Sequence, residues 1–317
     1  MKIVFIGTPD FSVPSLKKMI EKFDVRAVIT QPDRASGRGN KITISPIKEI
    51  GLLYKIPIYQ PEKIRKDFEI INKLREIEPD FIIVVAYGQI LPKEILNISK
   101  YGCINLHASL LPKYRGSSPI NWVLINGEKE TGSSTIIMDT GIDTGDILLK
   151  KRVAISESMS AGELYNILKE NGAELLQETI DGVVTGNVCR VNQDTEGSSY
   201  VPLLSKQMAK INWNDSSINI NNLIRGLSSW PYKNMNSWPT AHTNYKENII
   251  KIYKARALDV TTTKPPGYVI DTSNEGITVA TNEGILNIEV LQLPGGKPLE
   301  VKAFLKGNII EKGIILI

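Results

Sequence analysis

Apolar runs alternate with helical patterns along roughly the first 185 residues. The runs "KIVFI", "VRAVIT", "FIIVVA", "CINLHA" and "STIIMD" have the length and the branched residues that are typical of buried strands. Between them, "SLKKMIEKF", residues 63–77, "PINWVLI" and residues 161–180 repeat apolar side chains at helical spacing. Strands separated by helices predict an α/β fold with a mostly parallel sheet covered on both faces. Ligands of such sheets bind beyond the carboxyl ends of the strands.

The last 100 residues follow a different pattern. After a helical stretch near "INNLIRGLS", the short runs "NIIKIYKA", "GYVIDT", "GITVAT" and "GILNIEVLQL" are separated by turn residues. Short strands with tight turns predict a small C-terminal β-barrel. The stretch between about 186 and 208 is polar and rich in turn residues. We therefore expect a first domain over 1–188, a linker over 189–207 and a second domain over 208–317.

The composition fits two globular domains and excludes several classes of protein. A length of 317 residues with 42% hydrophobic residues is enough for two cores. We read neither a secretion signal nor a membrane span, and Cys103 and Cys189 cannot form a disulfide framework, so we expect a cytoplasmic protein. Two Cys and two His, widely separated, also argue against a structural zinc site.

The net charge of +4 belongs to the C-terminal third. From Lys206 onward there are 13 Lys and Arg against 9 Asp and Glu, whereas the residues before it carry 25 of each. A positive second domain suits a polyanionic partner, although a surplus of this size is also common on an ordinary solvated surface.

Asn105 and His107 stand two positions apart at the end of the predicted strand "CINLH". Side chains two apart on a strand share a face, so the amide and the imidazole should lie side by side. Together they can hydrogen-bond an oxyanion and move a proton. A histidine satisfied within the core is the competing interpretation.

The segment "MDTGIDTGDIL" places Asp139, Asp143 and Asp146 in a loop with two glycines. The calcium-loop template fails because its spacing and its closing glutamate are absent. A tight turn that uses Asp and Gly for backbone reasons explains the pattern equally well.

The polar stretch "QPDRASGRGNK", from Gln31 to Lys41, predicts a flexible basic loop. Arg34, Arg38 and Lys41 could clamp phosphates, or they could belong to an ordinary solvated loop. Neither the glycine fingerprint of dinucleotide sites nor the Walker phosphate loop is present, so a nicotinamide enzyme has little support.

Taken together, these segments resemble the methionyl-tRNA formyltransferase family. "GTPDF", "QPDR" with "GRG", "VVAYGQILP", "GCINLHASLLPKYRGSSPI" and "MDTGIDTGDIL" occur in the family's order, and the resemblance continues through "INW" and "WP" to "GYVI…GITVAT…GILNIEVLQLPGGKPL". It implies a Rossmann-like formyltransferase domain followed by a barrel that resembles the OB-fold. It also implies transfer of a formyl group from 10-formyltetrahydrofolate to methionyl initiator tRNA for translation initiation.

By motif, the resemblance also implies roles for individual residues. The catalytic residues would be Asn105, His107 and Asp143, with Asp143 chosen by its family position alone. The residues beside the folate would be Ser109, Leu110, Leu111 and Pro112, with the main chain of Gln89, Ile90 and Leu91. The residues beside the tRNA acceptor end would be Arg34, Arg38 and Lys41. No metal and no covalent nucleophile is required, and a monomer is expected.

Other interpretations stay open at this stage. A formyltransferase acting on a nucleotide-linked amino sugar would share the first domain's chemistry, whereas a purine-pathway formyltransferase would need only the first domain. A non-catalytic RNA-binding protein would leave the residues around Asn105 unexplained and lacks the stacking aromatics of such proteins. The stretch 228–242 is longer and more polar than the family pattern, so no barrel residue is assigned a role.

Overall fold

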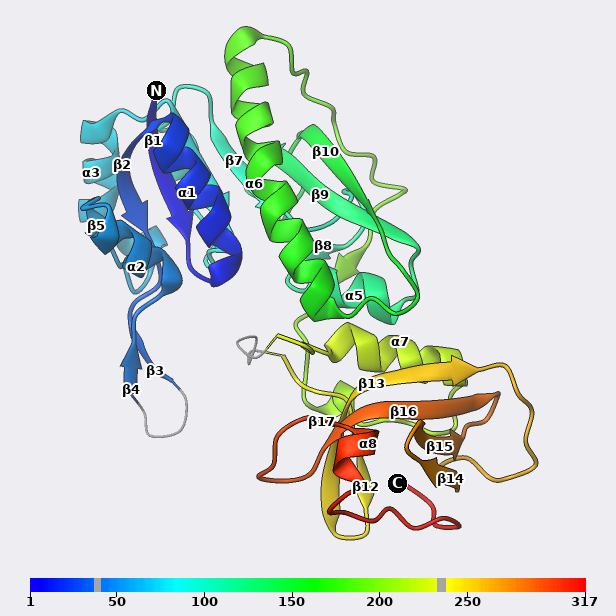
Figure 1. Ribbon diagram of the computed structural model, residues 1–317. Helices are drawn as coiled ribbons and strands as arrows, with labels where there is room; N and C mark the ends of the chain where they lie inside the picture. Colours follow the sequence, from blue (N-terminus) through cyan, green and yellow to red (C-terminus); the bar gives the residue numbers. More distant parts are fainter. Residues whose placement is uncertain (37–40, 233–237) are drawn as a thin grey trace. The chain divides into compact units, whose positions relative to one another are not determined.

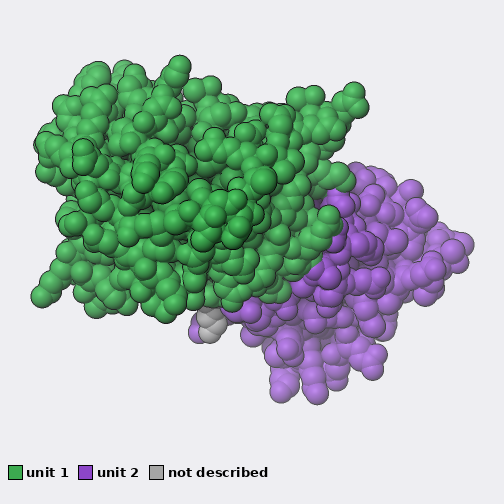
Figure 2. Space-filling view, turned by 90° about the horizontal axis from the view of Figure 1, so that it is seen from above, with its two compact units in different colours: residues 1–116, 131–153, 166–200 green, residues 117–130, 154–165, 201–317 purple. Residues whose placement is uncertain are grey.

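The computed structural model describes residues 1–36, 41–232 and 238–317. Its contacts divide the chain into two compact units (Figures 1 and 2). Unit 1 comprises Met1–Gly116, Thr131–Val153 and Asn166–Tyr200, and unit 2 comprises Ser117–Glu130, Ala154–Tyr165 and Val201–Ile317. The chain thus enters unit 2 twice before its C-terminal part begins. The domain boundaries at 188 and 208 stay a prediction.

Within the described residues, unit 1 is built on a seven-stranded sheet in the order β10-β9-β7-β6-β1-β2-β5. The strands are β1 (Lys2–Gly7), β2 (Asp24–Ile29), β5 (Ile58–Tyr59), β6 (Phe81–Val85), β7 (Cys103–His107), β9 (Glu130–Ile137) and β10 (Ile147–Ala154). In this sheet order, the neighbouring strands β7, β6, β1, β2 and β5 are all parallel, and β7 pairs antiparallel with β9. The predicted mostly parallel sheet is confirmed.

The strand order reverses between β1 and β6. From β1 the chain proceeds through β2 to β5 on one side, then returns to place β6 and β7 on the other side of β1. A crevice at the carboxyl ends of the strands is expected at such a switch point, because the connections on its two sides lead away from each other.

Helices cover this sheet (Figure 1). They are α1 (Val13–Lys22), α2 (Pro46–Leu53), α3 (Phe68–Ile77), α4 (Lys93–Leu96) and α6 (Ala161–Thr185), with the 3₁₀ turns η1 (Asp10–Ser12) and η2 (Ile64–Lys66). Alternate residues of the strands, including Ile82, Val84 and Cys103, pack in one core with residues of α3 and α4. This arrangement agrees with strands that are apolar on both faces.

The helix predicted over 63–77 is wrong in its first turn. The structure has the separate turn η2, and α3 begins only at Phe68. The reason is Asp67, whose carboxylate accepts a hydrogen bond from the Ile70 backbone amide at 3.1 Å and caps a new helix. A capping side chain satisfies amides that a continuous helix would bond internally.

The basic stretch predicted as a loop from Gln31 to Lys41 includes one short strand and the first residue of another. β3 (Arg34–Ser36) pairs antiparallel with β4 (Lys41–Thr43). Arg38 lies outside the described residues. Arg34 and Lys41 therefore belong to paired strands.

Unit 2 contains an antiparallel sheet in the order β12-β13-β16-β15-β14, with β17 beside β16. Its elements are β12 (His242–Tyr245), β13 (Asn248–Leu258), β14 (Val269–Ser273), β15 (Gly276–Ala280), β16 (Ile285–Gln292), β17 (Leu299–Glu300), α5 (Pro119–Ile125), α7 (Ser217–Leu227), α8 (Val301–Phe304) and η3 (Gln207–Ala209). The sheet and α7 enclose one apolar core. The predicted strands are confirmed, and the sheet curls as a half-barrel.

Helix α5 belongs to unit 2 because it packs against α7, with Asn121 donating a hydrogen bond to the Gly226 carbonyl at 2.8 Å. Among the described residues, no helix has both the length and the apolar character that crossing a membrane requires.

Candidate active site

Strand β7 positions Asn105 and His107 on one face of the unit 1 sheet. It lies between β6 and β9, with Asn105 opposite Val84 on one side and Ile136 on the other. Cys103 shares that face and is buried, and burial raises the pKa of its thiol to about 12. It therefore remains a protonated thiol and packs as a small apolar residue, in line with a mechanism without a cysteine nucleophile.

Asp143 joins these two residues from the loop between β9 and β10. Its Oδ1 accepts a hydrogen bond from Asn105 Nδ2 at 3.2 Å, and its Oδ2 accepts one from the Gly116 backbone amide at 2.9 Å. The same Oδ2 lies 3.4 Å from His107 Nδ1, and the two side chains are only 14% and 6% exposed. The structure thus brings all three residues named by motif into one cluster.

A backbone carbonyl fixes the other edge of the imidazole. His107 Nε2 lies 2.8 Å from the carbonyl oxygen of Tyr114. Because a carbonyl only accepts, Nε2 carries the hydrogen, and Nδ1 is the nitrogen that faces the Asp143 carboxylate. A proton gained at Nδ1 would make an ion pair with Asp143.

The aspartate loop uses its residues in different ways. The Asp139 carboxylate accepts hydrogen bonds from Gly141 N at 3.0 Å and from Thr144 Oγ1 at 2.7 Å, so this aspartate shapes the turn. A Cβ on Gly145 would lie 1.7 Å from the Ile137 carbonyl oxygen, which is why glycine is needed there. Within the described part of the chain, no group of three His, Cys, Asp or Glu could hold a metal ion.

The segment after His107 is largely enclosed by protein. Ser109 is fully buried and donates from Oγ to the Lys113 carbonyl at 2.7 Å, while Leu111 packs in a small core with Ile136 and Ile147. Leu110 and Pro112 are half-buried. Folate contact with Ser109, Leu110, Leu111 and Pro112 stays a prediction, and the half-buried pair offers the more accessible side chains.

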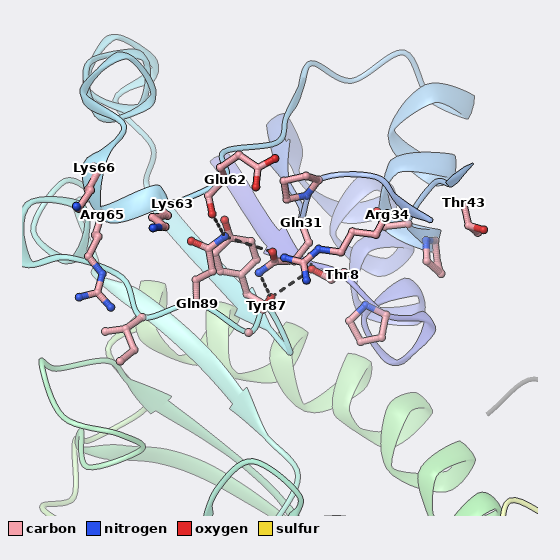
Figure 3. A pocket seen from close by; sticks show the side chains of 16 residues that line it. Thr8, Gln31, Arg34, Thr43, Glu62, Lys63, Arg65, Lys66, Tyr87 and Gln89 are labelled. Atoms are coloured by element: carbon pink, nitrogen blue, oxygen red, sulfur yellow. Dashed lines mark hydrogen bonds between the residues drawn. The ribbon is translucent and has the colours of Figure 1, made fainter. Parts of the chain in front are cut away.

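A cavity of about 980 Å³ lies at the carboxyl ends of β1, β2 and β6, which is the predicted switch point (Figure 3). Gln89 and Ile90, expected beside the folate, and Arg34, expected beside the tRNA, all line it. Within the described residues, no backbone–backbone hydrogen bond involves Gly88 to Leu91. The main chain of this loop can therefore bind a flat heterocycle that carries donors and acceptors.

The Gln89 side chain holds the cavity wall together. Its Oε1 accepts from the Ile64 backbone amide at 2.9 Å, and its Nε2 lies 3.4 Å from Gln31 Oε1. Gln31 in turn donates to the Tyr87 carbonyl at 3.1 Å. The buried Tyr87 hydroxyl has no hydrogen-bond partner among the described residues, and burial, with Asp67 nearby, raises its pKa.

The lining of the cavity is rich in cations that the sequence reasoning missed. Arg65 and Lys66 come from the turn η2 and Lys63 directly precedes it, and in Figure 3 all three lie on the opposite side of Tyr87 from Arg34. One carboxylate, that of Glu62, is among the lining residues. The signal was the run "EKIRK", residues 62–66, most of which falls in the first turn of the helix predicted over 63–77. The side chains of Arg38 and Lys41 cannot be added to this group, since Arg38 lies outside the described residues and only the backbone of Lys41 is described.

Comparisons with known proteins agree over the whole chain. The formyl transferase family matches residues 1–180, and the formyl transferase C-terminal domain matches residues 203–308. The chain is 54% identical over 311 residues to the methionyl-tRNA formyltransferase of Clostridium novyi, covering 98% of each, and 55% identical over 316 residues to that of Clostridium tetani, covering 100% of this chain and 99% of the relative.

Solved structures show the same fold. An N-formyltransferase from Helicobacter canadensis, in complex with folinic acid and dTDP-3-aminofucose, matches with a TM-score of 0.64 at 22% identity over 91% of this chain and 99% of its own. HypX from Aquifex aeolicus, in complex with tetrahydrofolic acid, matches with a TM-score of 0.61 at 15% identity over 97% of this chain and 47% of its own. By its match to the family along both parts and its identity to full-length relatives, the chain belongs to the formyl transferase family, among the methionyl-tRNA formyltransferases.

Proposed function

We propose that this chain transfers the formyl group of 10-formyltetrahydrofolate to the free α-amine of methionyl initiator tRNA, giving formylmethionyl-tRNA for translation initiation. The observation that carries the proposal is the cluster of Asn105, His107 and Asp143 at the carboxyl ends of the strands, in a chain about half identical to methionyl-tRNA formyltransferases along its length. Because its substrate is a tRNA used in translation, we place the protein in the cytoplasm.

Asn105 is suited to stabilise the negative charge that develops on the formyl oxygen. Its Nδ2 carries two hydrogens, and one of them is donated to Asp143. The second can be donated to the oxyanion as the amine attacks. His107 can add a donor there only if Nε2 turns from the Tyr114 carbonyl to the substrate.

Asp143 and His107 handle the proton. Bound 10-formyltetrahydrofolate supplies the formyl carbon, and its N10 leaves with a proton when the bond from nitrogen to carbon breaks. The attacking amine forms the new bond to carbon and must lose one proton. The Nδ1 atom of His107 and the carboxylate of Asp143 lie 3.4 Å apart, and this pair can accept the proton and return it to the leaving nitrogen.

The open main chain of Gly88 to Leu91 and the cavity wall fit a pterin edge. Arg34, Lys63, Arg65 and Lys66 line the cavity, where they can attract the phosphates at the aminoacylated end of the tRNA. The surplus of cations in the C-terminal third would bind the tRNA backbone.

Single-turnover formyl transfer tests the proposal. Purified protein is mixed with 10-formyltetrahydrofolate and methionyl initiator tRNA, with a UDP-amino sugar as a parallel acceptor and His107→Ala as the control. We expect transfer to the tRNA, and a fall of roughly 100-fold or more in the variant. Transfer to the sugar alone would refute the tRNA substrate, and equal rates in the variant would refute the role of His107.

A further inference from the structure

The polar stretch that follows α6 is bound to the loops that carry the active-site cluster. Val191 pairs with Ile147 through two backbone hydrogen bonds, of 2.8 and 2.9 Å, at the point where the aspartate loop ends. Seven residues after Asn192, Ser199 Oγ accepts a hydrogen bond from the Tyr114 backbone amide at 2.8 Å, and the Ser199 carbonyl accepts one from Arg115 N at the same distance. The stretch therefore contacts both loops that meet the His107 ring: the aspartate loop, which faces Nδ1, and the loop of Tyr114, which faces Nε2.

Gln193 is the centre of these contacts. Its side-chain Nε2 donates to two carbonyl oxygens of the aspartate loop, that of Asp143 at 2.8 Å and that of Gly145 at 2.7 Å. Its Oε1 accepts from Arg115 Nε at 3.1 Å and from Nη2 at 2.7 Å. The side chain thus makes four hydrogen bonds, which is the full capacity of an amide.

The surroundings make this linkage rigid. Gln193 and Arg115 are 5% and 4% exposed, so water cannot replace the bonds without an opening of the structure. The Arg115 guanidinium is also bonded to the Tyr200 hydroxyl at 3.2 Å and lies over its ring. It is therefore held from both ends of the 193–200 stretch.

The backbone of Asp143 needs such support. Its φ is +54°, a left-handed conformation that costs free energy in a residue other than glycine. A residue in this region keeps that conformation only when its neighbours impose it. Gln193 supplies this support, because the two carbonyls that it binds are those of Asp143 itself and of Gly145.

We propose that Gln193, anchored by Arg115, is a positioning residue that holds the Asp143 carboxylate against Asn105 and His107. The expected effect on kcat rests on the proposed function, whereas the positioning of the aspartate loop by Gln193 does not depend on it. Glutamine is suited to the place because one amide offers two donors to carbonyls and two lone pairs to a guanidinium, whereas a carboxylate offers no donor.

The variant Gln193→Glu tests this. The new carboxylate retains the contact with Arg115 as an ion pair, so folding should be preserved. It also replaces the donating Nε2 by an oxygen, which cannot donate to the carbonyls of Asp143 and Gly145. A displaced catalytic group lowers turnover more than binding, so we expect kcat to fall about 10- to 100-fold, with both KM values nearly unchanged. The matched control is Asn192→Ala. Asn192 is exposed, and among the described residues its side chain bonds only that of Asp146, at 3.3 Å, so this variant should keep wild-type kcat.

Coupling to Asp143 separates positioning from a general structural role. If Gln193 acts through Asp143, adding Gln193→Glu to Asp143→Ala causes little further loss of single-turnover rate. Losses that multiply, or a Gln193→Glu kcat equal to that of Asn192→Ala, would overturn the inference.

Hydrogen exchange supplies a readout that does not depend on the acceptor. Amides of residues 139–147 should exchange faster in Gln193→Glu than in the wild type and in Asn192→Ala. Unchanged exchange would refute the positioning role even in an active enzyme. If the wild type does not formylate methionyl-tRNA, the proposed function fails, and this measurement still decides whether Gln193 holds the loop.

Discussion

Two neighbouring regions at the strand ends of unit 1 are built on opposite principles. In the cluster around Asp143, short hydrogen bonds hold the polar atoms of Asp143 and Gln193. The Gln193 side chain is buried and the Asp143 side chain is half-buried. Around the cavity at β1 and β6, long cationic side chains such as Arg34 line an open volume. The difference shows which part needs fixed geometry. A proton transfer and an oxyanion require atoms in fixed places, whereas attraction of a phosphate backbone needs charge and tolerates side-chain freedom.

The largest expected effect is the loss of the Asn105 amide. Asn105→Ala removes the donor proposed for the oxyanion and one hydrogen bond to Asp143. Loss of one such donor typically costs about 3 to 4 kcal/mol in the transition state. We expect kcat to fall by about 100- to 1,000-fold in single-turnover assays, with a thermal unfolding midpoint close to that of the wild type. A variant as fast as the wild type would remove Asn105 from the mechanism.

A smaller effect of a different kind is expected at the cavity. The triple variant Lys63→Gln, Arg65→Gln, Lys66→Gln removes three cations without touching the cluster. We expect KM for the tRNA to rise about 10-fold, kcat to stay within about twofold, and the salt dependence of tRNA binding to become shallower by about 0.7 per lost phosphate contact.

The matched control for the triple variant removes charge elsewhere on unit 1. The control Lys17→Gln, Lys22→Gln, Lys73→Gln removes three cations from α1 and α3, and none of these residues lines the cavity. Binding as weak in this control as in the triple variant would mean that only net charge matters. If the triple variant lost kcat and kept its affinity for the tRNA, these cations would take part in the formyl transfer itself. The proposed difference between the cluster and the cavity would then be wrong.

The smallest effect concerns Asp33, which anchors the chain beside Arg34. Hydrogen bonds from Lys48 at 2.5 Å and from Gln60 at 2.8 Å lower the pKa of its carboxyl below the ordinary value of 3.8. A lowered folded-state pKa stabilises the fold above the unfolded value, and this stabilisation is lost as the pH falls through the folded value. Asp33→Asn should therefore unfold more easily than the wild type at pH 7, with the difference shrinking below pH 3.8.

Denaturant unfolding at several pH values checks the Asp33 prediction. Lys48→Met removes the same hydrogen bond from the other partner, so its deficit should fade over the same pH range. A deficit in Asp33→Asn that is equally large at pH 7 and pH 3 would show that the carboxylate charge contributes nothing there.

Much of the fold could be predicted from the sequence, because its signals are local. The strand "FIIVVA", the helix after Ala161 and the strands of unit 2 follow from patterns of a few residues, and the structure confirms them. The break at Asp67 was missed because apolar spacing continues across it, and only the capping hydrogen bond ends the pattern. The pairing of β3 with β4 was missed because polar strand ends resemble a loop.

The candidate site, too, was predicted only in part from the sequence. Strand periodicity by itself determined that Asn105 and His107 share a face, and the motif series pointed to Asp143. The sequence gives no means to see that a glutamine in an apparent linker bonds the carbonyls of Asp143 and Gly145, or that cations at 63–66 and at Arg34 surround one cavity. The physical reason is that these groups lie on segments 29 or more residues apart in the chain. Their geometry depends on how β1, β6 and β7 pair and on where the chain turns beyond them, and only the tertiary structure decides that.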